Sequence, residues 1–239
     1  MPFFQLAEII EKDSVLAGHV LRLVNSSLYG RSQTVYSVRH AVSMIGITRL
    51  RNLALSLSIT ALWTHVTFPP GWSRVKFSLH CVGCAVAADL LAQHLPVPYA
   101  EGAFTAGLLH DVGKLLIATA LPEHYEKIQL LNWEPAVERE VLGATHAELS
   151  SEILHRWKLP VEIQEAVAAH HLPSPDHSTP ALSDLVSLAD RFVILKGLSI
   201  DSRGGGNPAA ALAGWGIDDR IPNLIAEFER EHESIRAFF

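Results

Sequence analysis

Apolar residues recur every three or four positions along most of this 239-residue chain, and this spacing restricts the fold to packed helices. In the first 65 residues the helical pattern covers four segments, which are 4–12, 13–25, 37–45 and 48–63. Six further segments follow, which are 72–95, 100–120, 122–141, 146–157, 161–171 and 181–197. No strand is predicted, because even the branched residues of 161–167 follow a proline at helical spacing. We therefore expect an all-α fold.

Phe68-Pro69-Pro70-Gly71 interrupts the helical pattern. Proline cannot continue a helix and constrains the residue before it, so this segment predicts a boundary between two lobes. We expect an N-terminal helical lobe over 1–68 and a second lobe over 72–200. Near Gly204-Gly205-Gly206 a flexible loop should lead into a helical tail, so that 201–239 completes a single unit over 1–239.

The composition excludes several classes of protein. Hydrophobic residues make up 49% of the chain and charged residues 18%, as in a globular protein rather than a disordered one. The net charge of −6 argues against nonspecific binding of nucleic acid, which needs a basic surface. The pattern predicts neither a membrane span nor a signal peptide, so we expect a cytoplasmic protein with no membrane partner.

Cys81 and Cys84 are the two cysteines of the chain, spaced as C-x-x-C within a predicted helix. A structural zinc site would need two more ligands in matching spacing, and a thioredoxin-type site would need a strand before the helix. Neither context is present. We therefore interpret both as small core residues, with the adjacent His80 as a separate candidate.

Residues 107–114 read Gly-Leu-Leu-His-Asp-Val-Gly-Lys. An imidazole and a carboxylate at one point, here His110 and Asp111, can hold one or two divalent metals. Other candidate ligands lie in separate predicted helices that could line a bundle core. They are His80, His146, His170, His171 and Asp190.

The predicted helix positions of three of these candidates limit their roles. Thr145 and Glu148 form a capping-box pattern, so His146 should lie in the first turn of a helix, where it could simply make polar contacts. His170 and His171 are neighbours, and adjacent helical residues diverge by about 100°, so one of them should point inward.

The order of His80, His110 with Asp111, and Asp190 resembles the HD superfamily of metal-dependent phosphohydrolases. Its motif runs His, then His-Asp, then a later Asp. The N-terminal part resembles one branch, the HDOD domain of bacterial signalling proteins, in D-S-V-L-A, L-R-L-V-N-S and A-V-S-M-I-G. The likeness continues in G-A-T-H-A-E-L-S and R-W-K-L-P and covers about residues 5–200. It implies an HD-like helical bundle with an additional N-terminal helical lobe.

HDOD domains often lack a full set of metal ligands, whereas this chain has the ligand order of the HD-GYP cyclic dinucleotide phosphodiesterases. By that resemblance His80, His110, Asp111 and Asp190 form one metal site. Asp111 would bridge to a second ion held by His146 and by His170 or His171. The Gly-Tyr-Pro signature is missing, because the chain reads H-H-L-P-S-P-D-H at that point. This departure argues against hydrolysis of cyclic di-GMP.

Imidazole and carboxylate ligands suit iron, manganese, zinc or nickel, as one or two ions. Two ions bridged by a carboxylate could activate water for attack on phosphorus. Asp111 is therefore one candidate catalytic residue and Lys114 the other. Lys114 follows one helical turn later and would face a phosphate, or else be a solvated lysine.

Three functions are consistent with these patterns. The first is a signalling module with a mononuclear or dinuclear metal site, which regulates through a protein partner or a small nucleotide ligand. The second is a metal-dependent phosphohydrolase acting on a nucleotide or phosphodiester, and the third is oxygen or redox chemistry at a diiron centre. The missing signature favours the first, and the full ligand set favours the other two.

Overall fold

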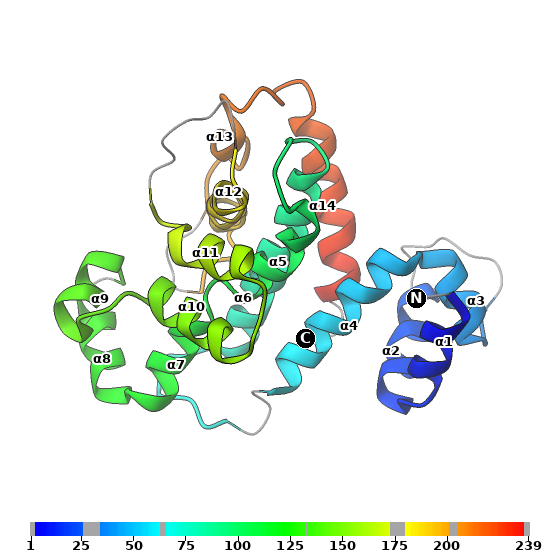
Figure 1. The fold of residues 1–239 in the computed structure, drawn as a ribbon, viewed down its shortest axis with the longest axis horizontal. Coiled ribbons are helices and arrows are strands. Elements are labelled where there is room, and N and C mark those ends of the chain that lie inside the picture. The colour runs from blue at the N-terminus through cyan, green and yellow to red at the C-terminus, as the bar shows by residue number, and fades with distance from the viewer. Residues whose placement is uncertain are drawn as a thin grey trace. The chain divides into compact units, whose positions relative to one another are not determined.

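The protein is all-α, as the apolar spacing predicts. The computed structural model describes residues 3–25, 34–62, 66–131, 133–172, 180–200 and 205–236, and within them there is no strand (Figure 1). The chain before the predicted boundary forms four helices, which are α1 (Phe3–Glu11), α2 (Ser14–Val24), α3 (Val38–Ile45) and α4 (Ile47–Leu62). The central helices are α5 (Arg74–Ala92), α6 (Ala103–Leu109), α7 (Val112–Ala120), α8 (Pro122–Leu130) and α9 (Pro135–Leu142). The remaining helices are α10 (His146–Arg156), α11 (Val161–Ala169), α12 (Leu182–Leu195), α13 (Ala209–Leu212) and α14 (Ile221–Arg236).

The chain divides into two compact units. One unit comprises Met1–His65 together with Glu229–Phe239, and the other comprises Val66–Phe228. The division at residue 65 lies close to the proline-rich segment. The last residues, however, belong with the N-terminal helices, although their sequence pattern predicts only a tail.

The first unit is held together by an apolar core and by polar contacts at helix ends. Its core includes Val20, Val24, Ala41 and Val42, all buried. The side chain of Asn25 donates a hydrogen bond of 2.8 Å to the carbonyl of Val35 and accepts one of 2.7 Å from its backbone N–H. These paired bonds connect the end of α2 to the segment that leads into α3.

The second unit is built around α5, which packs against α6 and α12. By length and hydropathy α5 could cross a membrane, but 72% of its most apolar 18-residue window is buried inside the fold. The helical segments 100–120 and 122–130 are long and apolar enough to cross a membrane only if they are counted as one span, and they meet at a bend of 113°. Burial of this kind is what a core helix of a helical bundle shows.

Two predicted helices are each divided in the structure. The segment 100–120 breaks at His110 and Asp111, where Asp111 has φ −103° and ψ 9° and precedes the first residue of α7. The segment 122–141 breaks between Leu130 and Pro135. Proline lacks the backbone N–H that a continuous helix would need, but suits the first position of a new one.

Two glycines allow the helices of the second unit to approach closely. A Cβ atom on Gly107 would lie 2.6 Å from the carbonyl oxygen of Cys84, so α6 lies directly against the backbone of α5. A Cβ atom on Gly113 would lie 2.2 Å from the carbonyl oxygen of His146, so α7 lies equally close to α10. His110 and Asp111, which lie between these two glycines, are therefore held close to α5 and α10.

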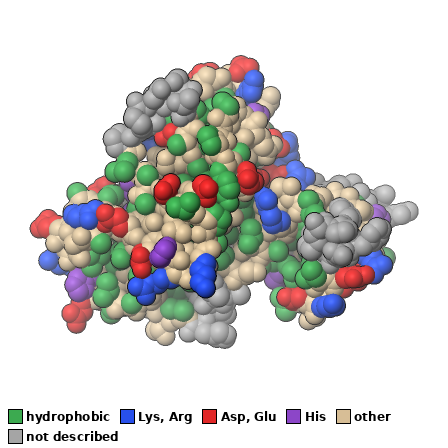
Figure 2. All heavy atoms as spheres, viewed as in Figure 1, with side chains coloured by type: hydrophobic (Ala, Val, Ile, Leu, Met, Phe, Trp, Pro, Cys, Tyr) green, Lys and Arg blue, Asp and Glu red, His purple; other side chains and the backbone are tan. Residues whose placement is uncertain are grey.

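The surface carries charges of both signs. Figure 2 shows Lys and Arg side chains interspersed with Asp and Glu over the visible face. Such a mixture agrees with a modest net charge and gives this face no continuous basic field.

Candidate metal centre

All seven candidate ligands come together in the second unit, although they are spread over more than a hundred residues of sequence. His80 lies on α5 and Asp190 on α12, while His110 and Asp111 form the junction between α6 and α7. His146 is the first residue of α10, and the predicted capping box of Thr145 and Glu148 is present. His170 and His171 follow the end of α11.

Both His170 and His171 reach the cluster, contrary to the expectation that one of them would. Nε2 of His171 lies 2.9 Å from Nε2 of His146, while His170 is fully buried. The expectation assumed that both residues are helical. Because α11 ends at Ala169, the two side chains are presented by a turn and their directions are not set by helical geometry.

The ring orientation of four histidines is fixed by their Nδ1 atoms. Those of His80, His110 and His170 lie 2.9, 2.8 and 2.6 Å from the backbone carbonyls of Leu198, Gly107 and Val167. Nδ1 of His146 lies 2.7 Å from the Glu138 carboxylate. Each Nδ1 has an acceptor, so in the neutral ring the proton lies on Nδ1 and the Nε2 lone pair is available to a metal. This tautomer can bind a metal through Nε2. The hydrogen bond from Nδ1 to a carbonyl or carboxylate is typical of metal-binding histidines.

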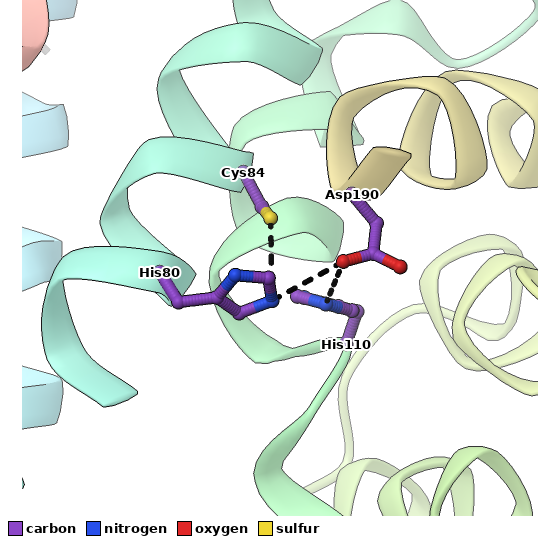
Figure 3. A group of neighbouring side chains, drawn as sticks. All are labelled: His80, Cys84, His110 and Asp190. Atoms are coloured by element: carbon purple, nitrogen blue, oxygen red, sulfur yellow. Dashed lines mark hydrogen bonds and ion pairs between the residues drawn. The ribbon is translucent and has the colours of Figure 1, made fainter. Parts of the chain in front are cut away.

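One group of potential ligands is drawn in Figure 3. It consists of His80, Cys84, His110 and Asp190, whose ligand atoms all lie within 4.8 Å of one another. Oδ1 of Asp190 is 3.2 Å from Nε2 of His80 and 3.8 Å from Nε2 of His110. All four residues are buried.

A second group consists of His146, His170 and His171, again with ligand atoms within 4.8 Å of one another. Asp111 lies between the two groups. Its Oδ2 is 3.4 Å from Nε2 of both His80 and His110, and its Oδ1 is 3.2 Å from Nε2 of His146. The two oxygens of one carboxylate thus face different groups, which is the arrangement of a bridging ligand.

The donor set fits divalent metal ions. Nε2 of His110 and His170, with Oδ1 of Asp111 and Asp190, are buried and make no hydrogen bond. Each such orphaned atom costs about 1–3 kcal/mol unless something binds it. Three buried carboxylates, those of Asp111, Glu138 and Asp190, also lie beside one ammonium, that of Lys114. One or two cations would satisfy the orphaned atoms and pair with the buried carboxylates.

The carboxylates of the cluster are ionised. Burial alone would raise the pKa of Asp111, but His110, Lys114 and His146 hold it well below its usual range. Burial would likewise raise the pKa of Asp190, but the neighbouring imidazoles of His110 and His80 hold it well below its usual range. Both carboxylates are therefore available as anionic ligands at neutral pH.

The pKa values of two histidines in the cluster are lowered. Burial and the neighbouring imidazoles hold the pKa of His170 well below its usual range. Burial, His146 and Lys114 lower the pKa of His171 to about 4. Both rings therefore have an unprotonated nitrogen to offer a metal at neutral pH.

Lys114 is an ion-pair partner rather than a solvated lysine. Its Nζ donates a hydrogen bond of 2.7 Å to Oδ2 of Asp111, and its side chain is 17% exposed. Burial would lower the pKa of Lys114, but Asp111 and Asp190 raise it above its usual value. The ammonium stays charged beside the cluster.

Cys84 and Glu138 belong to the site but are not among the residues proposed from the sequence. Cys84 lies four residues after His80, on the same face of α5, and burial raises the pKa of its thiol to about 11. Glu138, fully buried in the first turn of α9, accepts hydrogen bonds from the backbone N–H of His146 and from Nε1 of Trp133. Sequence patterns do not reveal Glu138, because its contact with His146 is made only in the folded chain.

The cluster opens into a cleft of about 260 Å³. Its polar wall includes His80, Lys114, His146 and Asp190. Its apolar wall is formed by Trp133, Pro135, Ile194 and Ile200. A small polar group could therefore reach the candidate ligands with an apolar portion beside it.

Replacing Glu138 with Gln should weaken metal binding by about 10–100-fold, as loss of such outer hydrogen-bond partners does. Glutamine has no charge, and its amide could place a donor against Nδ1 of His146. Isothermal titration with Mn²⁺ or Zn²⁺ would measure the change. Glu140→Gln, at an exposed position of the same helix, is the control and should bind as the parent does. Unchanged affinity in Glu138→Gln would mean that His146 does not bind the metal.

An all-helical fold with a buried histidine and aspartate cluster around a His-Asp pair defines an HD-type protein. The chain belongs to the HDOD domain family, whose model matches residues 2–173. A crystal structure of an HDOD domain protein of unknown function from Geobacter sulfurreducens superposes with a TM-score of 0.76 at 25% identity. That alignment covers 99% of this chain and 85% of the Geobacter chain.

A second solved structure comes from Marinobacter aquaeolei VT8 and is a proposed signal transduction protein. It superposes with a TM-score of 0.71 at 25% identity, covering 100% of this chain and 55% of that one.

Two curated proteins are also similar to this chain. An uncharacterized protein of Treponema pallidum is 26% identical over 203 residues, which are 76% of this chain and 37% of that protein. Ribonuclease Y of Thermus thermophilus is 32% identical over 111 residues, 46% of this chain and 15% of the enzyme. The chain therefore spans well under half the length of either protein.

Proposed function

We propose that this HDOD protein is a metal-dependent phosphohydrolase that acts on a phosphodiester or a nucleotide. The observation that carries the proposal is the convergence of seven imidazole and carboxylate side chains, of which His80, His146, His171 and Asp190 line an open cleft. A purely structural metal site is normally closed, whereas a catalytic one keeps a position open to water or substrate.

The residues of the chain have separate tasks in such a reaction. His80, His110 and Asp190 would hold one ion, His146, His170 and His171 another, with Asp111 between them. Bound metals would supply an activated water and charge stabilisation at phosphorus. Lys114, which stays protonated beside Asp111, would donate hydrogen bonds to a phosphoryl oxygen in the cleft.

The size of the cleft supports a small reacting group. At about 260 Å³ it is smaller than the pockets of roughly 300–1,000 Å³ that enclose drug-sized ligands. It accommodates a phosphate with part of one nucleoside rather than an entire cyclic dinucleotide. Residues 173–179, where the Gly-Tyr-Pro signature is missing, lie outside the described residues. The similarity to ribonuclease Y supports a phosphodiester as the substrate class.

A second candidate function is a signalling module in which the metal centre senses a ligand or stabilises the fold. The similarity to the Marinobacter protein, a proposed signal transduction protein, favours it. In that case a protein partner or small nucleotide would bind and no bond would be broken.

The test is a comparison of the parent chain with Lys114→Gln after loading with Mn²⁺, Fe²⁺, Zn²⁺ or Ni²⁺. We expect the parent to hydrolyse bis-p-nitrophenyl phosphate and Lys114→Gln to be about 100-fold slower, as enzymes lacking one such donor are. Metal content, measured by mass spectrometry, should not fall in the variant, because Lys114 is not a ligand.

Lys127→Gln, at an exposed position of α8, serves as the matched control and should keep the parent rate. p-Nitrophenyl phosphate and a short RNA, assayed in parallel, would separate monoester, diester and ribonuclease activities. A parent protein that binds metal but hydrolyses none of these substrates would favour the signalling module instead.

A further inference from the structure

We propose that Cys84 is a metal ligand, so that one of the two metal ions is bound by His80, Cys84, His110 and Asp190. Together with the bridging Asp111, the donor set would be two imidazole nitrogens, two carboxylate oxygens and one thiolate sulfur. This inference rests on the metal binding proposed above, and it adds a residue type that the His-Asp pattern of the chain does not contain.

The distances are close to those between ligands of one metal ion. Zinc bonds of about 2.3 Å to sulfur and 2.0–2.2 Å to nitrogen or oxygen place neighbouring ligand atoms about 3.3–3.6 Å apart at the tetrahedral angle. In the structure Sγ of Cys84 is 3.7 Å from Nε2 of His80, which in turn is 3.2 Å from Oδ1 of Asp190. Shifts of a few tenths of an ångström would bring these edges to the expected lengths.

The side chains point toward a common centre. In Figure 3 Sγ of Cys84 and Oδ1 of Asp190 are both directed toward Nε2 of His80, from two different helices. The ring of His110 approaches the same point from the junction of α6 and α7. The ligand atoms of these four residues lie within 4.8 Å of one another.

A thiol hydrogen bond to His80 would not account for the arrangement. It would satisfy Nε2 of His80, but the nearby Nε2 of His110 and Oδ1 of Asp190 would still be buried without a hydrogen bond. One cation at the centre would satisfy all four groups together. Cys81, the other buried cysteine, is not part of the group and supplies an internal comparison.

A thiolate ligand changes which metal the site selects. Thiolates favour zinc and iron, whereas oxygen-rich sites suit manganese and magnesium. The group of His146, His170 and His171 has no sulfur, so the two positions would differ in their preference. Binding at the Cys84 position would also release the thiol proton.

The experiment uses the full chain loaded with Co²⁺, because a bond from thiolate sulfur to Co²⁺ gives an intense charge-transfer absorption in the near ultraviolet. We expect this band in the parent protein and in Cys81→Ser, and its loss in Cys84→Ser. Serine preserves the size of the side chain and a donor toward His80, and circular dichroism would verify that each variant is folded.

Weaker visible bands and the measured cobalt content report metal binding independently of sulfur. Cobalt bound without the charge-transfer band in the parent would overturn the role of Cys84 and leave the metal centre intact. A band that persists in Cys84→Ser would likewise overturn it. Folded protein that binds no cobalt, zinc or manganese would overturn both this inference and the proposed function.

Discussion

Replacing Asp111 with Asn should lower the affinity for metal by about 100-fold or more and abolish hydrolysis. Asp111 is completely buried, and its two oxygens face His80, His110 and His146 from one position. Removing one partner of a buried charge network costs about 3–5 kcal/mol, and each 1.4 kcal/mol is a factor of ten in affinity. Metal analysis of protein purified without chelator, followed by a phosphodiesterase assay on the same samples, would measure both effects.

Asparagine is the informative replacement because it has nearly the shape of aspartate. Alanine would leave a cavity and deprive the Lys114 ammonium of its partner, so a loss of metal could reflect misfolding. Asp184→Asn is the matched control, since Asp184 is buried on α12 and accepts a hydrogen bond of 2.8 Å from the backbone of Ala181, outside the ligand groups. Parent-like metal content in Asp111→Asn would show that Asp111 does not bridge two ions.

The fold class could be predicted from the sequence because it depends on patterns within single helices, and the convergence of the candidate ligands because their order resembles that of a known family. Apolar spacing predicts each helix, and the capping box predicts where His146 begins one. The order of His80, His110, Asp111 and Asp190 then provides the family resemblance. None of these inferences requires knowing how one helix packs on another.

The details of the site depend on packing and could not be predicted in this way. The apolar pattern continues through Leu108, Leu109 and Val112, so nothing local signals the break that turns His110 and Asp111 toward other helices. Glu138, in the first turn of α9, meets His146 only because the chain reverses direction between α9 and α10.

Cys84 is an intermediate case. It lies four residues after His80, so helical geometry places both on one face, and this relation is visible in the sequence. The C-x-x-C spacing instead directs attention to the pair of cysteines. In the structure Cys84 lies beside His80, while Cys81 is a separate buried residue.

Gly113→Ala should destabilise the second unit by about 3 kcal/mol, near the upper end of the usual cost of overpacking. The added Cβ would lie 2.2 Å from the carbonyl oxygen of His146 and 2.9 Å from the backbone nitrogen of Ser150. Both atoms belong to backbone, so α7 and α10 would have to separate. For a unit of this size the loss corresponds to a fall in Tm of about 6–12 °C, measurable by calorimetry.

Gly18→Ala is the matched control, because a Cβ at this exposed position of α2 would meet nothing within 4 Å. In a helix interior alanine is more favourable than glycine by about 0.5–1 kcal/mol, so Gly18→Ala should not lower Tm. Separation of α7 from α10 would also move Asp111 away from His146, so Gly113→Ala should bind metal less tightly even where it remains folded. An unchanged Tm with unchanged metal affinity would show that the close approach of these two helices does not position the metal centre.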